Sequence, residues 1–214
     1  MRIEKIQPRT KAQSVEFDTG DIVEIANDVA AEFVLFRGKE LSEEQFADLR
    51  REQELFDAMT AAHRFLGYRV RSEREVREKL AGKKFSYEAI ERAIKKLHEG
   101  NYLDDGMFAL KYVHDALLKK PFGRTRLRQD LRRKGITDLA IDDALADQFD
   151  AGKEFEAAMR LAERRATKSK NEPLFKQKNA LRQYLLSRGF SRETIDAAIR
   201  EIFDNFVSAD NLSD

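Results

Sequence analysis

Side chains that could carry out acid–base or metal chemistry are few in this sequence and stand apart. The histidines His63, His98 and His114 lack the spacing of metal ligands, and the sequence contains no cysteine. Asp104 and Asp105 could bind a metal, but two carboxylates at a helix start are explained more simply as a cap. Glycine-rich phosphate-binding motifs are missing from the sequence as well. We therefore expect no enzymatic activity, no cofactor and no metal site.

Basic side chains are the other group with binding chemistry. Between positions 119 and 134 only Asp130 is acidic, and eight residues are basic: Lys119, Lys120, Arg124, Arg126, Arg128, Arg132, Arg133 and Lys134. On a helix, Arg124, Arg128 and Arg132 would share one face, and with Arg126 they are not needed for capping or packing. Guanidinium groups bind phosphates and carboxylates through paired hydrogen bonds. The run predicts contact with a polyanion or an acidic protein, and an ordinary solvated helix face is the alternative.

The elements that would position these arginines are repeated. LRQDLRRKGITDLAIDDAL (127–145) and LRQYLLSRGFSRETIDAAI (181–199) share their apolar positions and a glycine, and a weaker copy starts at Val76. Each copy predicts a helix, a stop at a left-handed residue and a second, capped helix. Another helical stretch precedes each copy, so a period of about 50 residues with three helices indicates a tandem helical array.

Two basic positions recur in the three copies. Arg77, Arg128 and Arg182 follow the first apolar residue, and they would form a spaced lane of guanidinium groups able to bind phosphates or carboxylates. Lys83, Lys134 and Arg188 lie at helix C-termini, where a cation stabilises the helix dipole. Surface charge without a partner is the alternative for the first set, and the local dipole suffices for the second.

The composition agrees with a helical protein. Charged residues make up 37% of the chain, whereas glycine and proline number only 10 and 3. The net charge of +1 hides an acidic N-terminal part and a basic C-terminal part, which favours a polyanionic or charge-patterned partner. The sequence contains no signal peptide and no apolar run of about 20 residues. We expect a cytoplasmic protein without a membrane segment.

Short β-type runs distinguish the N-terminal segment. They indicate two or three short antiparallel strands around the turn 18–21, a helix over 28–36 closed by Gly38, and a capping box that begins at Ser42. The predicted fold is mostly α: a tandem array of three three-helix repeats after a small β-hairpin/α segment. We divide the chain into residues 1–52 (the N-terminal segment), 53–103 (the first repeat), 104–152 (the second) and 153–214 (the third, with a tail).

Three stretches together resemble the RecX family of recombination regulators: GYRVRSEREVREKL (67–80), GNYLDDGMFA (100–109) and RLRQDLRRKGI (126–136). The resemblance covers roughly residues 53–206. Its signatures, R-S-E-x-E-V-R-x-K-L and Y-L-D-D-x-x-F-A, are specific when paired. They are carried by Arg71, Ser72, Glu75, Val76, Leu80, Tyr102, Leu103, Asp104, Asp105 and Phe108, to which we assign structural roles. Lys84 replaces the usual glycine, which predicts a strained helix stop, and Gly106 replaces a common acidic residue.

The resemblance implies a modulator of the RecA recombinase that has no enzymatic activity. Members of this family are similar tandem three-helix proteins that lie in the groove of the RecA–single-stranded DNA filament. They usually restrain filament assembly, ATP hydrolysis and strand exchange. The implied partners are the RecA filament and single-stranded DNA, met directly or through the filament, and we expect the chain to act as a monomer.

Two other functions stay open at this point. Helix–turn–helix units also occur in DNA-binding proteins of the transcription-factor type, although here the basic residues recur across three repeats. A general helical scaffold for protein interactions would make the basic residues incidental.

Overall fold

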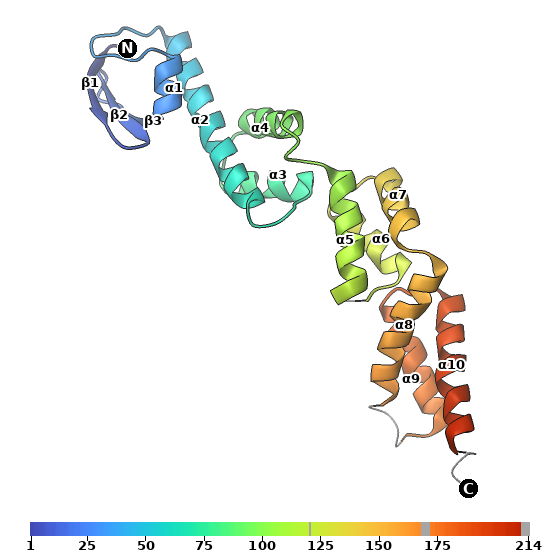
Figure 1. Ribbon diagram of the computed structural model, residues 1–214. Helices are drawn as coiled ribbons and strands as arrows, with labels where there is room; N and C mark the ends of the chain where they lie inside the picture. Colours follow the sequence, from blue (N-terminus) through green and yellow to red (C-terminus); the bar gives the residue numbers. More distant parts are fainter. Residues whose placement is uncertain (120, 168–171, 211–214) are drawn as a thin grey trace. The chain divides into compact units, whose positions relative to one another are not determined.

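The protein is described by a computed structural model that covers residues 1–119, 121–167 and 172–210 (Figure 1). Its chain divides into two compact units, Met1–Leu103 and Asp104–Asp214. The first unit contains a small sheet, a short helix and a three-helix bundle. The second unit contains two further three-helix bundles. Within the described residues, no helix combines the length and the apolar character needed to cross a membrane.

Three antiparallel strands open the first unit in the order β1-β2-β3. They are β1 (Ile3–Pro8), β2 (Ala12–Phe17) and β3 (Ile22–Ala26). The expectation of two or three short antiparallel strands is confirmed, and the sheet has three. Ile3, Val15, Phe17 and Ile25 are buried because alternate side chains of each strand point to the same face. That face is covered by α1 (Asn27–Glu32) and by the first turns of α2 (Glu43–Leu66).

The short helix α1 ends at Glu32, four residues before the expected Phe36. The reason lies in the backbone at Val34, which takes a positive φ of 48° that a helix cannot contain. Lys39 then satisfies the carbonyl groups left free at the helix end, because its ammonium group donates to the oxygens of Phe33 and Val34.

Helix α2 is longer than the sequence indicates. Ser42 and Gln45 form the expected capping box, with the Gln45 amide 3.1 Å from the Ser42 hydroxyl oxygen. The helix then runs without a break through the proposed boundary between residues 52 and 53. Leu49 packs in the core of the sheet, whereas Leu55, Ala58 and Ala62 pack in the core of the first bundle. One helix therefore serves two cores.

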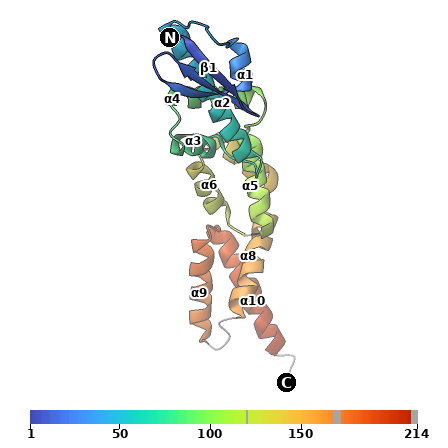
Figure 2. The ribbon, with the colours of Figure 1, turned by 90° about the vertical axis from the view of Figure 1, so that its left-hand side faces the viewer.

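Each repeat folds as a bundle with its own apolar core (Figures 1 and 2). In the first bundle α2 packs with α3 (Glu73–Gly82) and α4 (Tyr87–Glu99). The second bundle consists of α5 (Asp105–Lys119), α6 (Arg124–Arg133) and α7 (Asp138–Gln148). The third consists of α8 (Ala151–Ala166), α9 (Leu174–Ser187) and α10 (Arg192–Asp210). The tandem array of three-helix repeats is confirmed.

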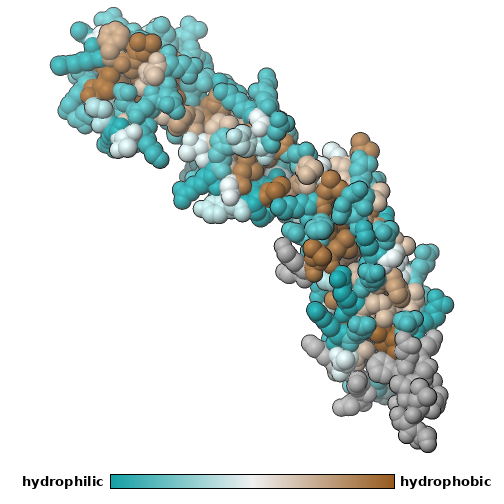
Figure 3. Space-filling model, in the orientation of Figure 1, coloured by the Kyte–Doolittle hydropathy of each residue, from teal (hydrophilic) through white to brown (hydrophobic). Residues whose placement is uncertain are grey.

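The apolar positions of the repeat are the buried ones. In the second bundle Leu127, Leu131, Ile141 and Leu145 are fully buried, and their counterparts in the other two bundles are buried as well. Their spacing of one helical turn places them on one face of each helix. On the face drawn in Figure 3 hydrophilic residues predominate, and apolar residues show among them.

The turn between the second and third helices is the same in all three bundles. Gly135 and Gly189 have φ angles of 85° and 81°, and Lys84 takes the same left-handed conformation at 66°. Ser86, Thr137 and Ser191 then cap the third helices by accepting a hydrogen bond from a backbone amide three residues on. The expectation of strain at Lys84 agrees with its positive φ, since a Cβ there is unfavourable by about 1–2 kcal/mol.

Candidate polyanion-binding surface

The repeated arginines are held by an ion pair that recurs in every bundle. Arg128 lies 2.5 Å from Asp142, and Arg182 lies 3.0 Å from Asp196, in both cases with the acid 14 positions further along. Arg77 makes the same contact with Glu91, Nη2 to Oε2 at 3.1 Å. Each pair joins the second helix of a bundle to the third. The positive charges of these arginines are thus offset inside their own bundles.

Arg77 has a second acidic partner. Its Nε donates to Glu73 at 2.6 Å, and Glu73 also lies 2.7 Å from His98. Burial pushes the pKa of Glu73 up, but hydrogen bonds from Arg77 and His98 outweigh burial and hold that pKa below its usual value. The hydrogen bond from Arg77 likewise lowers the pKa of Glu91, and the two acids raise the pKa of Arg77. These charges stabilise the bundle.

The predicted face Arg124, Arg128 and Arg132 is occupied by contacts within the second bundle. Arg124 donates to the carbonyl oxygen of Phe149 and covers its ring, and Arg132 pairs with Asp138 at 2.7 Å. The Arg132 contact lowers the pKa of Asp138. These three arginines therefore have partners inside the bundle, and their contact with a polyanion or an acidic protein stays a prediction. Their partners come from the segment 138–149, which the helical spacing alone could not place.

Arg126 lies on a different side of α6, where cations and aromatic rings alternate. Its guanidinium lies 5.8 Å from the Phe122 ring, and Arg188 of the third bundle lies 5.5 Å from the same ring. Arg188 also lies 5.1 Å from the Tyr184 ring, next to Arg165 at 5.6 Å. The contacts run continuously from the second bundle to the third, inside one unit.

Asp130 extends this row toward the end of α6. It accepts from Arg126 at 3.0 Å and lies 3.6 Å from Arg133. Lys134 lies 5.7 Å from the ring of Tyr112, whose hydroxyl is 3.5 Å from Asp130. We call this surface the basic–aromatic row, defined by Arg126, Arg133, Lys134, Arg165 and Arg188 with Phe122 and Tyr184.

The row is rich in basic side chains. Arg126 and Arg133 both pair with Asp130, whose side chain is 14% exposed against 69% for Arg133. The exposed guanidinium of Arg133 above a less exposed acid presents positive charge outward, which attracts anions. Guanidinium groups beside rings can also stack with planar groups. The geometry suits a polyanion with planar bases or an acidic protein.

The sequence predicted only some residues of the basic–aromatic row as binding residues. Arg126, Arg133 and Lys134 were expected to bind, whereas Arg188 was assigned to its helix dipole alone. The one sequence feature that pointed to this surface is the presence of the aromatic residues Phe122 and Tyr184 near the basic runs, although the two residues lie far apart in the sequence. Of the two lysines before the helix, Lys120 lies outside the described residues, and Lys119 is the last residue of α5.

The signature residues have structural roles in the first unit. Ser72 is fully buried and forms a capping box with Glu75, which also binds Arg69 at 3.0 Å. Arg71 covers the Phe65 ring at 4.0 Å, and its pKa is lowered by burial and by Arg69. Val76, Leu80 and Leu103 are buried in the first core, and Phe108 in the second.

The remaining signature residues surround the start of α5. Asp104 caps this helix by accepting from the Met107 amide at 2.9 Å, and Asp105 is its first residue. Gly106 does not interrupt the start. Tyr102 is exposed and packs edge-on against His63 at 4.5 Å. The expectation that Asp104 and Asp105 form a helix start is confirmed.

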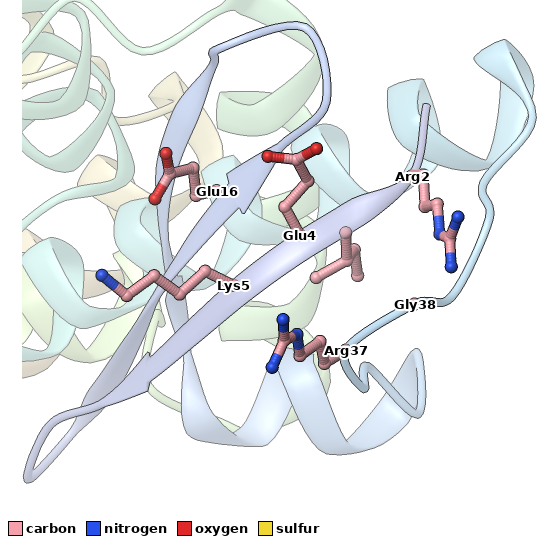
Figure 4. A pocket seen from close by; sticks show the side chains of 7 residues that line it. Arg2, Glu4, Lys5, Glu16, Arg37 and Gly38 are labelled. Carbon is pink, nitrogen blue, oxygen red and sulfur yellow. The ribbon is translucent and has the colours of Figure 1, made fainter.

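A polar hollow lies on the N-terminal sheet (Figure 4). Glu4 and Glu16 reach to one side of it, and Arg37 reaches toward β1 from the following loop. Because both signs of charge line the hollow, it offers no single charge to a ligand. Among the described residues, no group of three or more acidic or histidine side chains is placed to hold a metal ion.

Comparison with known proteins matches each bundle in turn. Residues 58–97 match the first three-helix domain of RecX, residues 104–145 the second and residues 153–199 the third. Regulatory protein RecX of Limosilactobacillus reuteri is 30% identical, with 94% of this chain and 76% of that protein covered. Regulatory protein RecX of Clostridioides difficile is 28% identical, with 96% and 97% covered.

Solved structures give the same answer. The chain is similar to a crystal structure of regulatory protein RecX, with a TM-score of 0.74 and 30% identity over 91% of this chain and 97% of that one. It is also similar to the crystal structure of RecX from Lactobacillus salivarius, with a TM-score of 0.63 and 28% identity over 69% and 96%. From its three matched domains and its relatives, this chain belongs to the RecX family.

Proposed function

We propose that the chain is a non-enzymatic regulator of homologous recombination that binds the RecA–single-stranded DNA filament. In this proposal it restrains filament assembly, ATP hydrolysis and strand exchange. Its family membership supports a regulatory role, because its relatives are named regulatory proteins. The proposal places the protein in the cytoplasm as a monomer without a cofactor, with partners in the recombinase and single-stranded DNA.

The basic–aromatic row is the observation that carries this proposal. A nucleoprotein filament presents phosphates and bases of a single strand together with protein carboxylates. Rows of cations follow a phosphate backbone, and aromatic rings accept bases by stacking. The row offers both groups side by side, since the Arg188 guanidinium lies 5.5 Å from the centre of the Phe122 ring and 5.1 Å from that of Tyr184.

The row would act by occupying the surface that filament subunits and DNA strands need. Each phosphate contact releases counterions, so binding weakens as salt rises, with a slope of about −0.7 per phosphate on a single strand. Arg124, Arg128, Arg132, Arg77 and Arg182 take a smaller part in this proposal. Four of them pair with carboxylates inside their own bundles, and Arg124 donates to the Phe149 carbonyl oxygen.

The test compares a triple variant of the row, Arg126→Gln, Arg133→Gln and Arg165→Gln, with the unchanged protein. We measure affinity for bare single-stranded DNA, duplex DNA and recombinase-coated DNA at several salt concentrations, and inhibition of the filament's ATP hydrolysis. We expect weaker filament binding and loss of inhibition. If phosphates are the contact, the salt slope flattens by up to about 2.

A matched control removes three cations elsewhere: Arg51→Gln, Arg74→Gln and Lys95→Gln. These residues form exposed ion pairs with Asp48, Glu78 and Glu99 of the first unit. The control has the same net charge as the row variant and should keep inhibition. If both variants inhibit the filament's ATP hydrolysis equally, the proposal that the basic–aromatic row contacts the filament is contradicted. Preferential binding to duplex DNA would instead favour a helix–turn–helix protein.

A further inference from the structure

The first unit contains a hollow of about 630 Å³. Ala61 and Phe65 of α2 contribute to its lining, together with Phe85 from the turn that follows α3. Tyr68, which is 74% exposed, stands at its side. The hollow has an apolar lining and is large enough to accept one bulky side chain.

The hollow exists because one position of the repeat is small. Ala58 and Ala62 of the first bundle correspond to the buried Ala109 and Val113 of the second, so Ala61 corresponds to Tyr112. In the second bundle Lys134 lies over the Tyr112 ring at 5.7 Å. In the first bundle the corresponding Lys83 and Ala61 both line the hollow. The methyl group leaves the space that a tyrosine ring fills in the second bundle.

Cations surround this space. Arg64, Lys79 and Lys83 line it, and in the described part of the chain none of the three has an ion pair with a carboxylate. Lys79 only approaches the Phe65 ring, at 5.6 Å. Asp57 is the acidic residue of the lining. Most other cations of this unit's helices are paired, as Arg77 and Arg92 are.

An apolar hollow with an unpaired basic rim matches a particular chemistry. Acidic motifs are recognised by clusters of cations, and peptides anchor through one buried apolar side chain. Single-stranded nucleic acid fits less well, because it stacks on successive exposed rings, and at the hollow Tyr68 is exposed whereas the Phe65 ring is covered by Arg71 at 4.0 Å.

We propose that this hollow is a docking site for an acidic peptide segment of a partner protein that inserts one bulky apolar side chain. The apolar side chain would contact Ala61, Phe65 and Phe85. Carboxylates on either side of it would pair with Arg64, Lys79 and Lys83. This site does not depend on the filament contact proposed above, and its occupant is recognised without DNA.

The test uses the full chain and two fluorescent peptides. One is a run of aspartate and glutamate with a single central leucine, and the other has serine in place of the leucine. We expect the leucine peptide to bind roughly tenfold or more tightly, because burying a leucine side chain changes affinity by about that factor. Equal affinities of the two peptides would overturn the proposal.

Two variants locate the site. Ala61→Tyr fills the hollow with the residue of the second bundle and should abolish the preference for leucine, whereas Ala146→Tyr, at an exposed position of α7, should keep it. Lys79→Gln with Lys83→Gln should weaken both peptides and reduce their salt dependence, against Lys95→Gln with Lys96→Gln as a control of equal charge. These lysine variants keep the test valid if Ala61→Tyr does not fold.

Single-stranded oligothymidylate is the third probe. We expect Ala61→Tyr to leave its binding unchanged. If oligothymidylate binding is lost in this variant while peptide binding persists, the occupant is nucleic acid and the proposal is wrong. Because the peptide assay contains neither recombinase nor DNA, its outcome is separate from that of the filament assay.

Discussion

Gly123 and Gly189 meet backbone to backbone where the second bundle joins the third. A Cβ added to Gly123 would lie 2.2 Å from the carbonyl oxygen of Gly189. The Gly123 amide donates to the Arg188 carbonyl at 2.9 Å, and the Thr125 amide donates to Gly189 at 3.2 Å. This contact holds Arg188 next to Phe122, and therefore it assembles the basic–aromatic row.

Gly123→Ala should separate the two bundles locally. Overpacking at a contact of this kind costs about 1–3 kcal/mol, and the neighbour here is backbone that cannot rotate away. We expect a lower free energy of unfolding in denaturant melts and weaker filament binding. Gly82→Ala is the control, because a Cβ at Gly82 meets nothing within 4 Å. Gly82 lies in α3, so alanine should leave stability unchanged or raise it by up to about 1 kcal/mol.

Lys84→Gly should stabilise the first unit. Lys84 has a φ of 66°, whereas the other two bundles carry glycine in the same left-handed turn. Removing the Cβ relieves about 1–2 kcal/mol of local strain, offset by up to about 1 kcal/mol of added backbone freedom in the unfolded chain. We expect a net gain between about 0 and 2 kcal/mol in urea melts of the full chain. The reverse change, Gly135→Lys, should destabilise the second unit, and a loss of stability in Lys84→Gly would contradict the account.

Leu131→Ala and Leu185→Ala test the buried positions of the repeat. Both side chains are fully buried, in the second and third cores respectively. A leucine truncated to alanine in a core costs about 2–5 kcal/mol through lost burial and the cavity that remains. Leu139→Ala, at a position that is 74% exposed, should cost far less. Thermal melts that do not distinguish the three variants would mean that the repeat does not fold as described.

The acids that bind Arg77 predict the direction of a pH effect on the first unit. The pKa values of Glu73 and Glu91 are lowered in the folded state. A lowered pKa contributes stability above the unfolded-state value, near 4.5, and this stability is lost as the pH falls through the folded-state pKa. We expect Arg77→Gln to lower the urea midpoint at pH 7 and to lower it much less at pH 3. A difference that is the same at both pH values would show that Arg77 contributes by packing rather than by charge.

The sequence determined the bundles because their signals are local. Leu127 and Leu131 lie one turn apart, Gly135 stops the helix and Thr137 caps the next one. Each of these features acts within about six residues, so a pattern in the chain is enough to show it. The repetition of that pattern gave the number and order of the bundles.

The capping box at Ser42 marked the start of α2, but the sequence did not show that this helix continues past the proposed boundary at residue 53. A helix that packs against one core shows one apolar stripe. The first half of α2 turns Leu49 toward the sheet, and the second half turns Ala58 and Ala62 toward the bundle. Two stripes on one helix weaken the period, and only the tertiary structure shows that both belong to it.

The candidate surface was decided by tertiary structure for the same reason. Helical spacing grouped Arg124, Arg128 and Arg132 correctly on one face, but a face becomes available only if no neighbour covers it. Asp138, Asp142 and Phe149 supply partners to the arginines of that face. The close approach of Gly123 to Gly189 brings Arg188 and Tyr184 to Arg126 from more than 50 residues away. The sequence shows which side chains carry charge. Whether that charge is neutralised or exposed depends on contacts between distant segments, which form only in the folded chain.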